Sequence, residues 1–207
     1  MARMKQLFNE IATRRCEAIL EIGAYNGQSA RRLANAAFRK SRTVTYHGFD
    51  LFELCTADTL NPDSPRKPPT LAEVQAFLTA FQSEMERKPL WMRREFRFAL
   101  HQGYSGDTLS AFRTANPSFR ADAILIDGGH HVDVIDQDWS YCSEMLAPGG
   151  VIYLDDHYDR PRFPGEYGAN TLAERLQSSG EWMVDVLPVS DPGNKNTGIR
   201  VVRVARR

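Results

Sequence analysis

Three aspartates follow two apolar runs of the sequence. Residues 123–126 are all apolar and lead to Asp127, and residues 151–154 lead to Asp155 and Asp156. Short apolar runs bounded by Gly and Asp are typical of parallel strands buried on both faces, and ligands of open α/β sheets bind beyond the carboxyl ends of such strands. Carboxylate oxygens suit hard divalent cations. The sequence therefore predicts a metal site where these two strands end.

A glycine-containing turn follows a third apolar run, at residues 18–22. Gly23 and Gly27 allow the backbone to turn tightly and to approach a ligand closely. Ala24 and Tyr25 stand where a dinucleotide fingerprint has its second glycine, which disfavours a pyrophosphate. The next run, residues 43–49, is followed by Asp50, whose carboxylate can accept hydrogen bonds from both hydroxyls of a ribose. These residues predict a nucleoside site; the alternative is a tight strand-to-helix turn without a ligand.

Strand-like and helix-like segments alternate along the chain. We expect helices at 3–13, 28–39, 70–88, 107–115, 132–146 and 168–179, and strands at 18–23, 43–50, 95–101, 122–127, 150–155, 182–188 and 198–204. The turn-rich segment 189–198 leaves no room for a crossover helix, so the last two strands should be antiparallel. The pattern predicts an α/β fold, a Rossmann-like doubly wound seven-stranded sheet with an antiparallel last strand, in one domain of residues 1–207.

The composition limits the class of partner. The chain has 207 residues, and its 26 Lys and Arg residues are balanced by 26 Asp and Glu residues. It therefore has no net positive charge that would attract nucleic acid. No apolar run is long enough for a membrane span, and three widely spaced cysteines indicate neither a disulfide framework nor a zinc site. We expect a soluble, cytoplasmic protein whose partner is a small molecule rather than nucleic acid or a membrane. The sequence leaves open whether it forms a homo-oligomer.

From about residue 17 to its end, the chain resembles the class I S-adenosylmethionine-dependent methyltransferases. The segment 21–27 resembles the first motif of that family, Asp50 its second-strand acid, and the segment 146–152 its turn before the fifth strand. The segment 100–106 resembles the loop that borders the adenine in small-molecule O-methyltransferases. The resemblance implies S-adenosyl-L-methionine as cofactor, bound by Glu21, Gly23, Ala24, Tyr25, Gly27, Asp50, Gly103, Tyr104, Ser105 and Asp127.

Within that class, the segments 126–131 and 154–157 resemble metal-dependent O-methyltransferases, both the catechol type and the type that methylates sugars on antibiotics. The resemblance implies that Asp127, Asp155 and Asp156 bind Mg²⁺, with Mn²⁺ as a substitute, so that Asp127 serves catalysis as well. A metal-bound hydroxyl loses its proton near neutral pH, and an imidazole can accept that proton. His130 is the preferred base.

Several alternatives stay open at this stage. His131 and His157 are rival bases. The antibiotic-type pattern has a second acid where this chain has Gly129, so relatives that use that acid as base are a poor guide.

The resemblance implies a Mg²⁺-dependent O-methyltransferase that acts on a hydroxyl of a small molecule. The alternatives are a metal-independent methyltransferase of the same fold, and a nucleotide-binding oxidoreductase or sensing module. We expect the proline-rich loops 58–69 and 158–168 to be mobile and to close over the acceptor.

Overall fold

The computed structural model describes residues 2–56, 67–159, 168–192 and 198–207. Its α-helices are α1 (Ala2–Thr13), α2 (Gln28–Ala37), α3 (Leu71–Glu86), α4 (Ser105–Ala115), α5 (Val132–Glu144) and α6 (Gly168–Ser179). Its strands are β1 (Ala18–Ile22), β2 (Thr43–Asp50), β3 (Glu95–Gln102), β4 (Ala121–Ile126), β5 (Leu146–Tyr158), β6 (Trp182–Val186), β7 (Asp191–Pro192) and β8 (Gly198–Arg206). Two 3₁₀ turns, η1 (Phe52–Leu54) and η2 (Leu90–Met92), precede α3 and β3.

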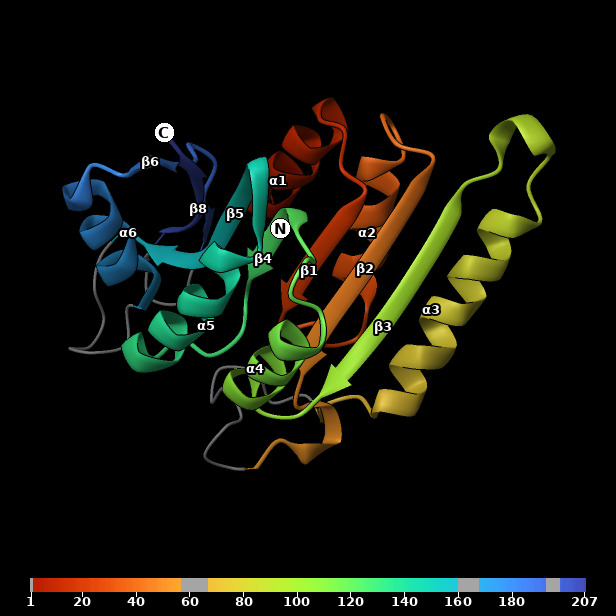
Figure 1. Cartoon of the computed structure of the whole chain (residues 1–207), viewed down its shortest axis with the longest axis horizontal. Helices are drawn as coiled ribbons and strands as arrows, with labels where there is room; N and C mark the ends of the chain where they lie inside the picture. Colours follow the sequence, from red (N-terminus) through yellow and green to blue (C-terminus); the bar gives the residue numbers. More distant parts are fainter. Residues whose placement is uncertain (1, 57–66, 160–167, 193–197) are drawn as a thin grey trace.

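The sheet has the strand order β3-β2-β1-β4-β5-β8-β6, which can be followed from right to left in Figure 1. Neighbouring strands from β3 to β5 are parallel, whereas β8 is antiparallel to both β5 and β6. The short β7 pairs with the beginning of β8. The predicted doubly wound sheet with an antiparallel last strand is therefore confirmed.

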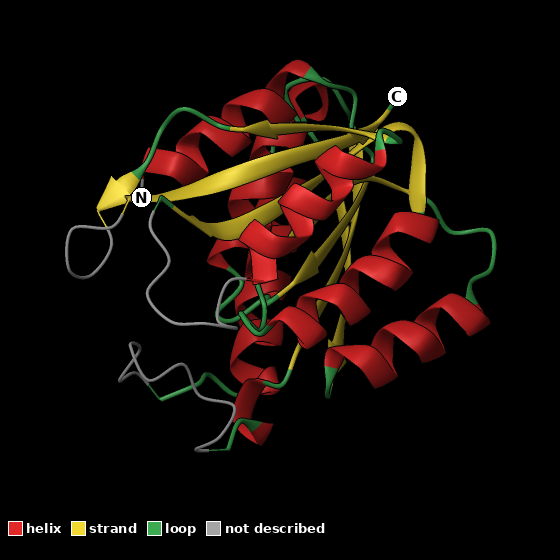
Figure 2. Cartoon of the chain, turned by 90° about the vertical axis from the view of Figure 1, so that its left-hand side faces the viewer, coloured by secondary structure: helices red, strands yellow, loops and turns green. Residues whose placement is uncertain are grey.

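Helices cover both faces of this sheet (Figure 2). Successive side chains of a strand point to opposite faces, and both faces are apolar here. In β4, Ala123 and Leu125 pack into the core cluster that includes residues of α1, α2 and α3, while Ile124 and Ile126 pack into the cluster that includes residues of α4, α5 and α6. Burial on both sides explains why the central strands are continuous apolar runs. None of the helices in the described ranges has the length and apolarity that a membrane crossing requires.

Two elements differ from the sequence prediction near the expected site. β5 does not end at Asp155 but continues to Tyr158, and its pairing with β8 shifts register between Leu154 and His157. Asp156 has a positive φ of 57° at this irregularity. A bulge of this kind changes the direction of side chains within a strand. The paired aspartates thus lie at a bend inside β5 rather than at its end. α4 begins at Ser105, two residues earlier than expected.

The predicted mobile loops, 58–69 and 158–168, fall largely on residues 57–66 and 160–167. Those residues lie outside the described part of the chain, so the expectation of a lid stays a prediction.

Candidate functional site

Gly23 joins the turn after β1 to the turn after β4. Its φ is +88°, a backbone conformation that residues other than glycine rarely adopt. A Cβ atom at this position would lie 2.0 Å from the backbone oxygen of Asp127. The amide of Gly23 donates to the carbonyl of Phe49 (2.9 Å), and the amide of Asp127 donates to the carbonyl of Ile22 (2.9 Å). Only glycine allows the two turns to approach this closely.

Asp50 connects two other predicted cofactor-binding positions, Tyr25 and Gly103. Its Oδ2 atom accepts a hydrogen bond from the amide of Tyr25 and its Oδ1 atom accepts one from Phe52, each at 2.7 Å. The amide of Gly103 donates to the backbone carbonyl of Asp50 (3.0 Å). Each carboxylate oxygen has a further lone pair, so Asp50 can accept from a ribose hydroxyl while it holds these turns. The ends of β1, β2 and β3 therefore form one continuous border.

Glu21 is fully buried at the end of β1. It accepts a hydrogen bond of 2.5 Å from the hydroxyl of Tyr46, and burial raises the pKa of its carboxyl to about 7. Burial disfavours the charged form of this carboxyl, so a cationic partner beside it would be attracted strongly in a medium that screens charge weakly. Such a group suits a ligand that carries a positive charge, as S-adenosylmethionine does on its sulfur.

The other predicted cofactor positions have different surroundings. Ala24 is buried, whereas Tyr25 is 36% exposed and has a φ of +43°. Gly27 also has a positive φ, and its backbone packs against α3. Tyr104 precedes α4 and is exposed, with its hydroxyl donating to Oε1 of Gln137 on α5 (3.0 Å). Ser105 is the first residue of α4.

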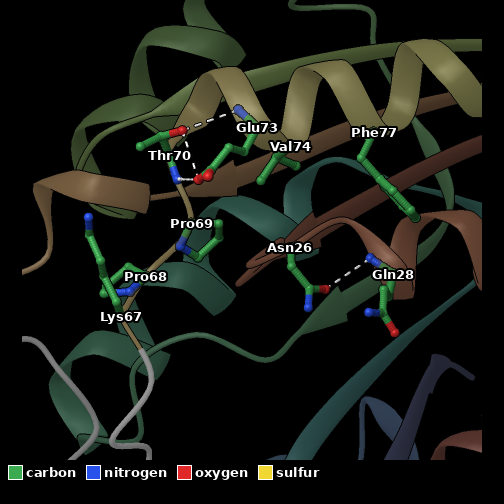
Figure 3. Close-up of a pocket in the computed structure, with 9 residues that line it drawn as sticks. All are labelled: Asn26, Gln28, Lys67, Pro68, Pro69, Thr70, Glu73, Val74 and Phe77. Carbon is green, nitrogen blue, oxygen red and sulfur yellow. Dashed lines mark hydrogen bonds between the residues drawn. The ribbon is translucent and has the colours of Figure 1, made fainter.

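A cavity of about 490 Å³ opens beside the 23–27 turn (Figure 3). In the close-up, Asn26 and Gln28 lie below Val74 and Phe77 of α3, and Thr70 and Glu73 form a reciprocal capping box at the start of that helix. The volume of the cavity lies within the range of small-molecule binding sites. The residues that line it are Asn26, Gln28, Lys67, Pro68, Pro69, Thr70, Glu73, Val74 and Phe77.

The second half of the site is an acidic cluster, which we define as Asp127, Asp155 and Asp156. Arg3 on α1 points into it. Nε of Arg3 lies 2.7 Å from Oδ1 of Asp155, and its Nη2 lies 2.9 Å from Oδ2 of Asp155 and 3.3 Å from Oδ1 of Asp156. Arg3 and Asp155 are both buried, at 8% and 4% exposure. The start of α1 therefore meets the bend of β5 through a bidentate ion pair.

Asp191 of β7 holds Arg3 from the other side. Its Oδ2 atom lies 3.4 Å from Nη1 of Arg3 and accepts from the Arg3 amide at 3.3 Å, while Oδ1 accepts from the Ala2 amide at 2.5 Å. Acceptors at the first amides of a helix also complement its dipole. Burial disfavours the charge of Arg3, but the hydrogen bonds and charges of Asp155, then Asp156, outweigh it, so the pKa of Arg3 stays above its usual value. The guanidinium is a permanent cation in this cluster.

Among the residues that the structure describes, Asp127 forms no ion pair of this kind. Burial, followed by the charges of Asp155 and Asp156, raises the pKa of Asp127 well above its usual range. Like charges in a poorly solvated site disfavour ionisation.

The predicted magnesium site is not supported by this arrangement. Across the described ranges, no three or more His, Cys, Asp and Glu side chains are grouped so that they could hold a metal ion. The carboxylate oxygens of Asp155 that would bind the ion accept from Arg3, and a guanidinium and a divalent cation cannot occupy the same position. Sequence reasoning missed Arg3 because an arginine on an amphipathic N-terminal helix ordinarily lies at the surface.

His130 adjoins the same cluster. Its Nδ1 atom lies 2.8 Å from Oδ2 of Asp156, and its side chain is 31% exposed. The carbonyl of His130 accepts from the amide of Gly168 at the start of α6 (3.1 Å), which fixes the backbone at this position.

The rival histidines lie elsewhere. The side chain of His131 is 64% exposed, and its Nδ1 is 3.7 Å from Asp133. His157 follows the bend of β5, with Nε2 3.4 Å from the amide nitrogen of Asn170, and burial lowers its pKa. Of the three imidazoles, His130 is the one that contacts the acidic cluster.

Comparison with known families matches residues 20–157 to the family described as "Methyltransferase domain". These residues contain the glycine turn, Asp50 and the whole acidic cluster. A comparison with curated protein sequences found no significant match.

The solved structures that are similar to this chain include three methyltransferases. The O-methyltransferase TomG of Streptomyces achromogenes, in complex with S-adenosylmethionine, is 17% identical, with 99% of this chain and 79% of that chain covered and a TM-score of 0.65. The calicheamicin methyltransferase CalS11 is 16% identical, with 95% and 76% covered and a TM-score of 0.64. An O-methyltransferase of Bacillus cereus is 18% identical, with 99% and 81% covered and a TM-score of 0.61.

These neighbours share the fold of this chain, and the family match covers its cofactor turn. The chain belongs to the methyltransferase domain family and is a class I S-adenosylmethionine-dependent methyltransferase.

Proposed function

We propose that this methyltransferase acts on a hydroxyl oxygen of a small molecule, with His130 as the general base. The observation that carries the proposal is the contact between Nδ1 of His130 and Asp156, on a ring that is partly open to solvent. A carboxylate at Nδ1 favours the tautomer that has its proton on Nδ1. Nε2 is then left as the acceptor.

The chemistry requires a nucleophilic oxygen in line with an electrophilic methyl group. S-adenosylmethionine, when bound, supplies that methyl group on a positively charged sulfur. Nε2 of His130 accepts the proton of the acceptor hydroxyl as the oxygen–carbon bond forms and the carbon–sulfur bond breaks. Asp156 stabilises the imidazolium, and the proton passes to solvent after the products leave. Atoms and charge balance without a further reactant.

The cofactor is assigned to the ends of the first four strands. Asp50 would hold the ribose and the 23–27 turn would approach the nucleoside closely, because Gly23 leaves no side chain in the way. Gly103, Tyr104 and Ser105 would border the adenine, as the sequence resemblance implies. Glu21 would attract the cationic part of the cofactor.

Magnesium has no step in this proposal, because the oxygens expected to bind it are engaged by Arg3. A small-molecule acceptor remains a prediction from the balanced charge, and a cytoplasmic location remains one from the widely spaced cysteines. Whether the chain forms a homo-oligomer has no bearing on the steps above.

The test uses S-adenosylmethionine with a ¹³C-labelled methyl group and a panel of small molecules that offer hydroxyl, amine, thiol or carbon acceptors. We expect product only with hydroxyl compounds, identified by the NMR shift of a methyl group bonded to oxygen. His130→Ala should lower kcat by about 10²–10⁴-fold with unchanged cofactor affinity. His131→Ala is the matched control and should retain activity. Methylation of nitrogen, sulfur or carbon alone would contradict the proposal.

A further inference from the structure

The acidic cluster already contains a cation, supplied by the chain itself. Nη2 of Arg3 contacts one oxygen of Asp155 and one of Asp156, at 2.9 and 3.3 Å, so this nitrogen lies between the two carboxylates. Nε binds the second oxygen of Asp155 at 2.7 Å. A cation that bridges two neighbouring carboxylates would occupy the same position. The guanidinium and a divalent ion are therefore mutually exclusive there.

The position of Arg3 is fixed by its surroundings. The residue is 8% exposed, and Asp191 accepts hydrogen bonds from both its side chain and its amide. Breaking a buried ion pair by removing one partner leaves an uncompensated charge, which is strongly unfavourable. For a divalent ion to enter, Arg3 would have to leave three aspartates and a buried position. Arg3 is thus a built-in part of the site rather than a transient neighbour.

We propose that Arg3 takes the place of a divalent cation in this methyltransferase: its guanidinium neutralises Asp155 and Asp156 and holds Asp156 against His130, so that methyl transfer needs no metal ion. Arg3 is a positioning residue in this account, because it acts through Asp156. A planar guanidinium suits the role, since its donors match carboxylate geometry and its charge is permanent. A lysine would supply charge without the bidentate contact.

The first experiment measures cation binding and needs no acceptor. Mn²⁺ is titrated into the full chain by calorimetry after exhaustive dialysis against EDTA. We expect no Asp155-dependent binding at millimolar Mn²⁺, and unchanged thermal unfolding with and without the ion. Binding of one Mn²⁺ that the Asp155→Asn variant loses would overturn the proposal.

The second experiment measures transfer and rests on the proposed function. The EDTA-dialysed protein should keep its full kcat, and added Mg²⁺ should not raise it. Arg3→Ala should lower kcat at least tenfold with an unchanged dissociation constant for S-adenosylhomocysteine, and millimolar methylguanidinium should restore part of the loss. Lys5→Ala removes an exposed cation of the same helix and should leave all these values unchanged.

The two experiments separate the two hypotheses. If no hydroxyl compound is methylated, the proposed function fails, and the Mn²⁺ titration still decides the role of Arg3. If Arg3→Ala does not fold, Arg3→Lys tests the same contact with charge retained, and should lose kcat without loss of cofactor affinity. Activity that EDTA abolishes and Mg²⁺ restores in the parent protein would overturn the inference while leaving O-methyl transfer intact.

Discussion

Nδ1 of His130 lies 2.8 Å from Oδ2 of Asp156, although the two residues are 26 positions apart in the sequence. His130 belongs to the turn after β4, and Asp156 lies at the bend within β5. The two residues meet because β4 and β5 are adjacent parallel strands. A carboxylate that accepts from Nδ1 fixes both the tautomer and the orientation of an imidazole.

Replacement of that carboxylate should therefore reduce catalysis without affecting the cofactor. We expect Asp156→Asn to lower kcat by about 10²–10⁴-fold, because an amide can donate to Nδ1 and stabilise the wrong tautomer. Steady-state kinetics and calorimetric titration of S-adenosylhomocysteine measure the two quantities. Asp133→Asn, at the exposed 3.7 Å contact with His131, is the matched control and should retain full kcat. Equal losses in the two variants would exclude the pairing as a cause.

Loss of the Asp50 carboxylate should weaken cofactor binding. Asp50→Ala removes the expected ribose contact and the acceptors for Tyr25 and Phe52, and should cost about 2–3 kcal/mol of binding free energy. Asp122→Ala is the control, because Asp122 likewise accepts from two amides, those of Glu17 and Ala18, at the start of β1. That control should reduce stability but not affinity. Unchanged affinity in Asp50→Ala would refute the ribose assignment.

Gly23 and Gly149 offer a matched pair of substitutions. Both have a positive φ, +88° and +74°, so alanine at either site should cost about 1–2 kcal/mol of unfolding free energy. A Cβ at Gly149 meets no atom within 4 Å, whereas at Gly23 it would overlap the backbone of Asp127. We expect Gly23→Ala to lose more stability and at least tenfold in cofactor affinity. Chemical denaturation would measure the stability of the two variants, and calorimetric titration of S-adenosylhomocysteine would measure their cofactor affinity. Equal losses in Gly23→Ala and Gly149→Ala would argue against the close approach of the two turns.

Acid should destabilise the fold through His47. Its ring packs against His101 between β2 and β3, with Nδ1 3.2 Å from Nε2, and burial, then the neighbouring His101, lowers the pKa of His47 to about 4. An unfolded histidine titrates near pH 6.5. Between these values this histidine binds more protons in the unfolded chain than in the folded chain, so its contribution to the free energy of unfolding should fall as the pH drops from about 6.5 towards about 4.

Urea unfolding at a series of pH values measures this slope. His47→Gln removes this titration, so its stability should fall less on acidification than that of the parent protein, whereas His131→Gln, at an exposed position, should follow the parent. Equal pH slopes in the parent protein and in His47→Gln would contradict the expected burial of a neutral imidazole.

The sequence predicted which strand ends would lie together better than it predicted the contacts of the paired aspartates. Gly23, Asp50 and Asp127 follow apolar runs, and strand ends in a parallel sheet converge wherever the runs are buried on both faces. Asp155 and Asp156 were identified by the same logic, but the bend in β5 depends on pairing with β8 and leaves no local signal. The partner of Asp155 lies 152 residues away, and contacts over that distance follow from packing rather than from periodicity.

The contacts of Arg3 with Asp191 connect positions 188 residues apart. On the ribosome, Asp155 and Asp156 are synthesised before Asp191, so the nascent chain contains the paired acids before Asp191 is available to hold Arg3. Such non-local contacts form late, because a long loop must close first. Local opening at β7 and β8 would in turn release the start of α1 and leave the acids without their cation. The stability of the acidic cluster thus depends on the pairing of β7 with β8, the strand next to β5.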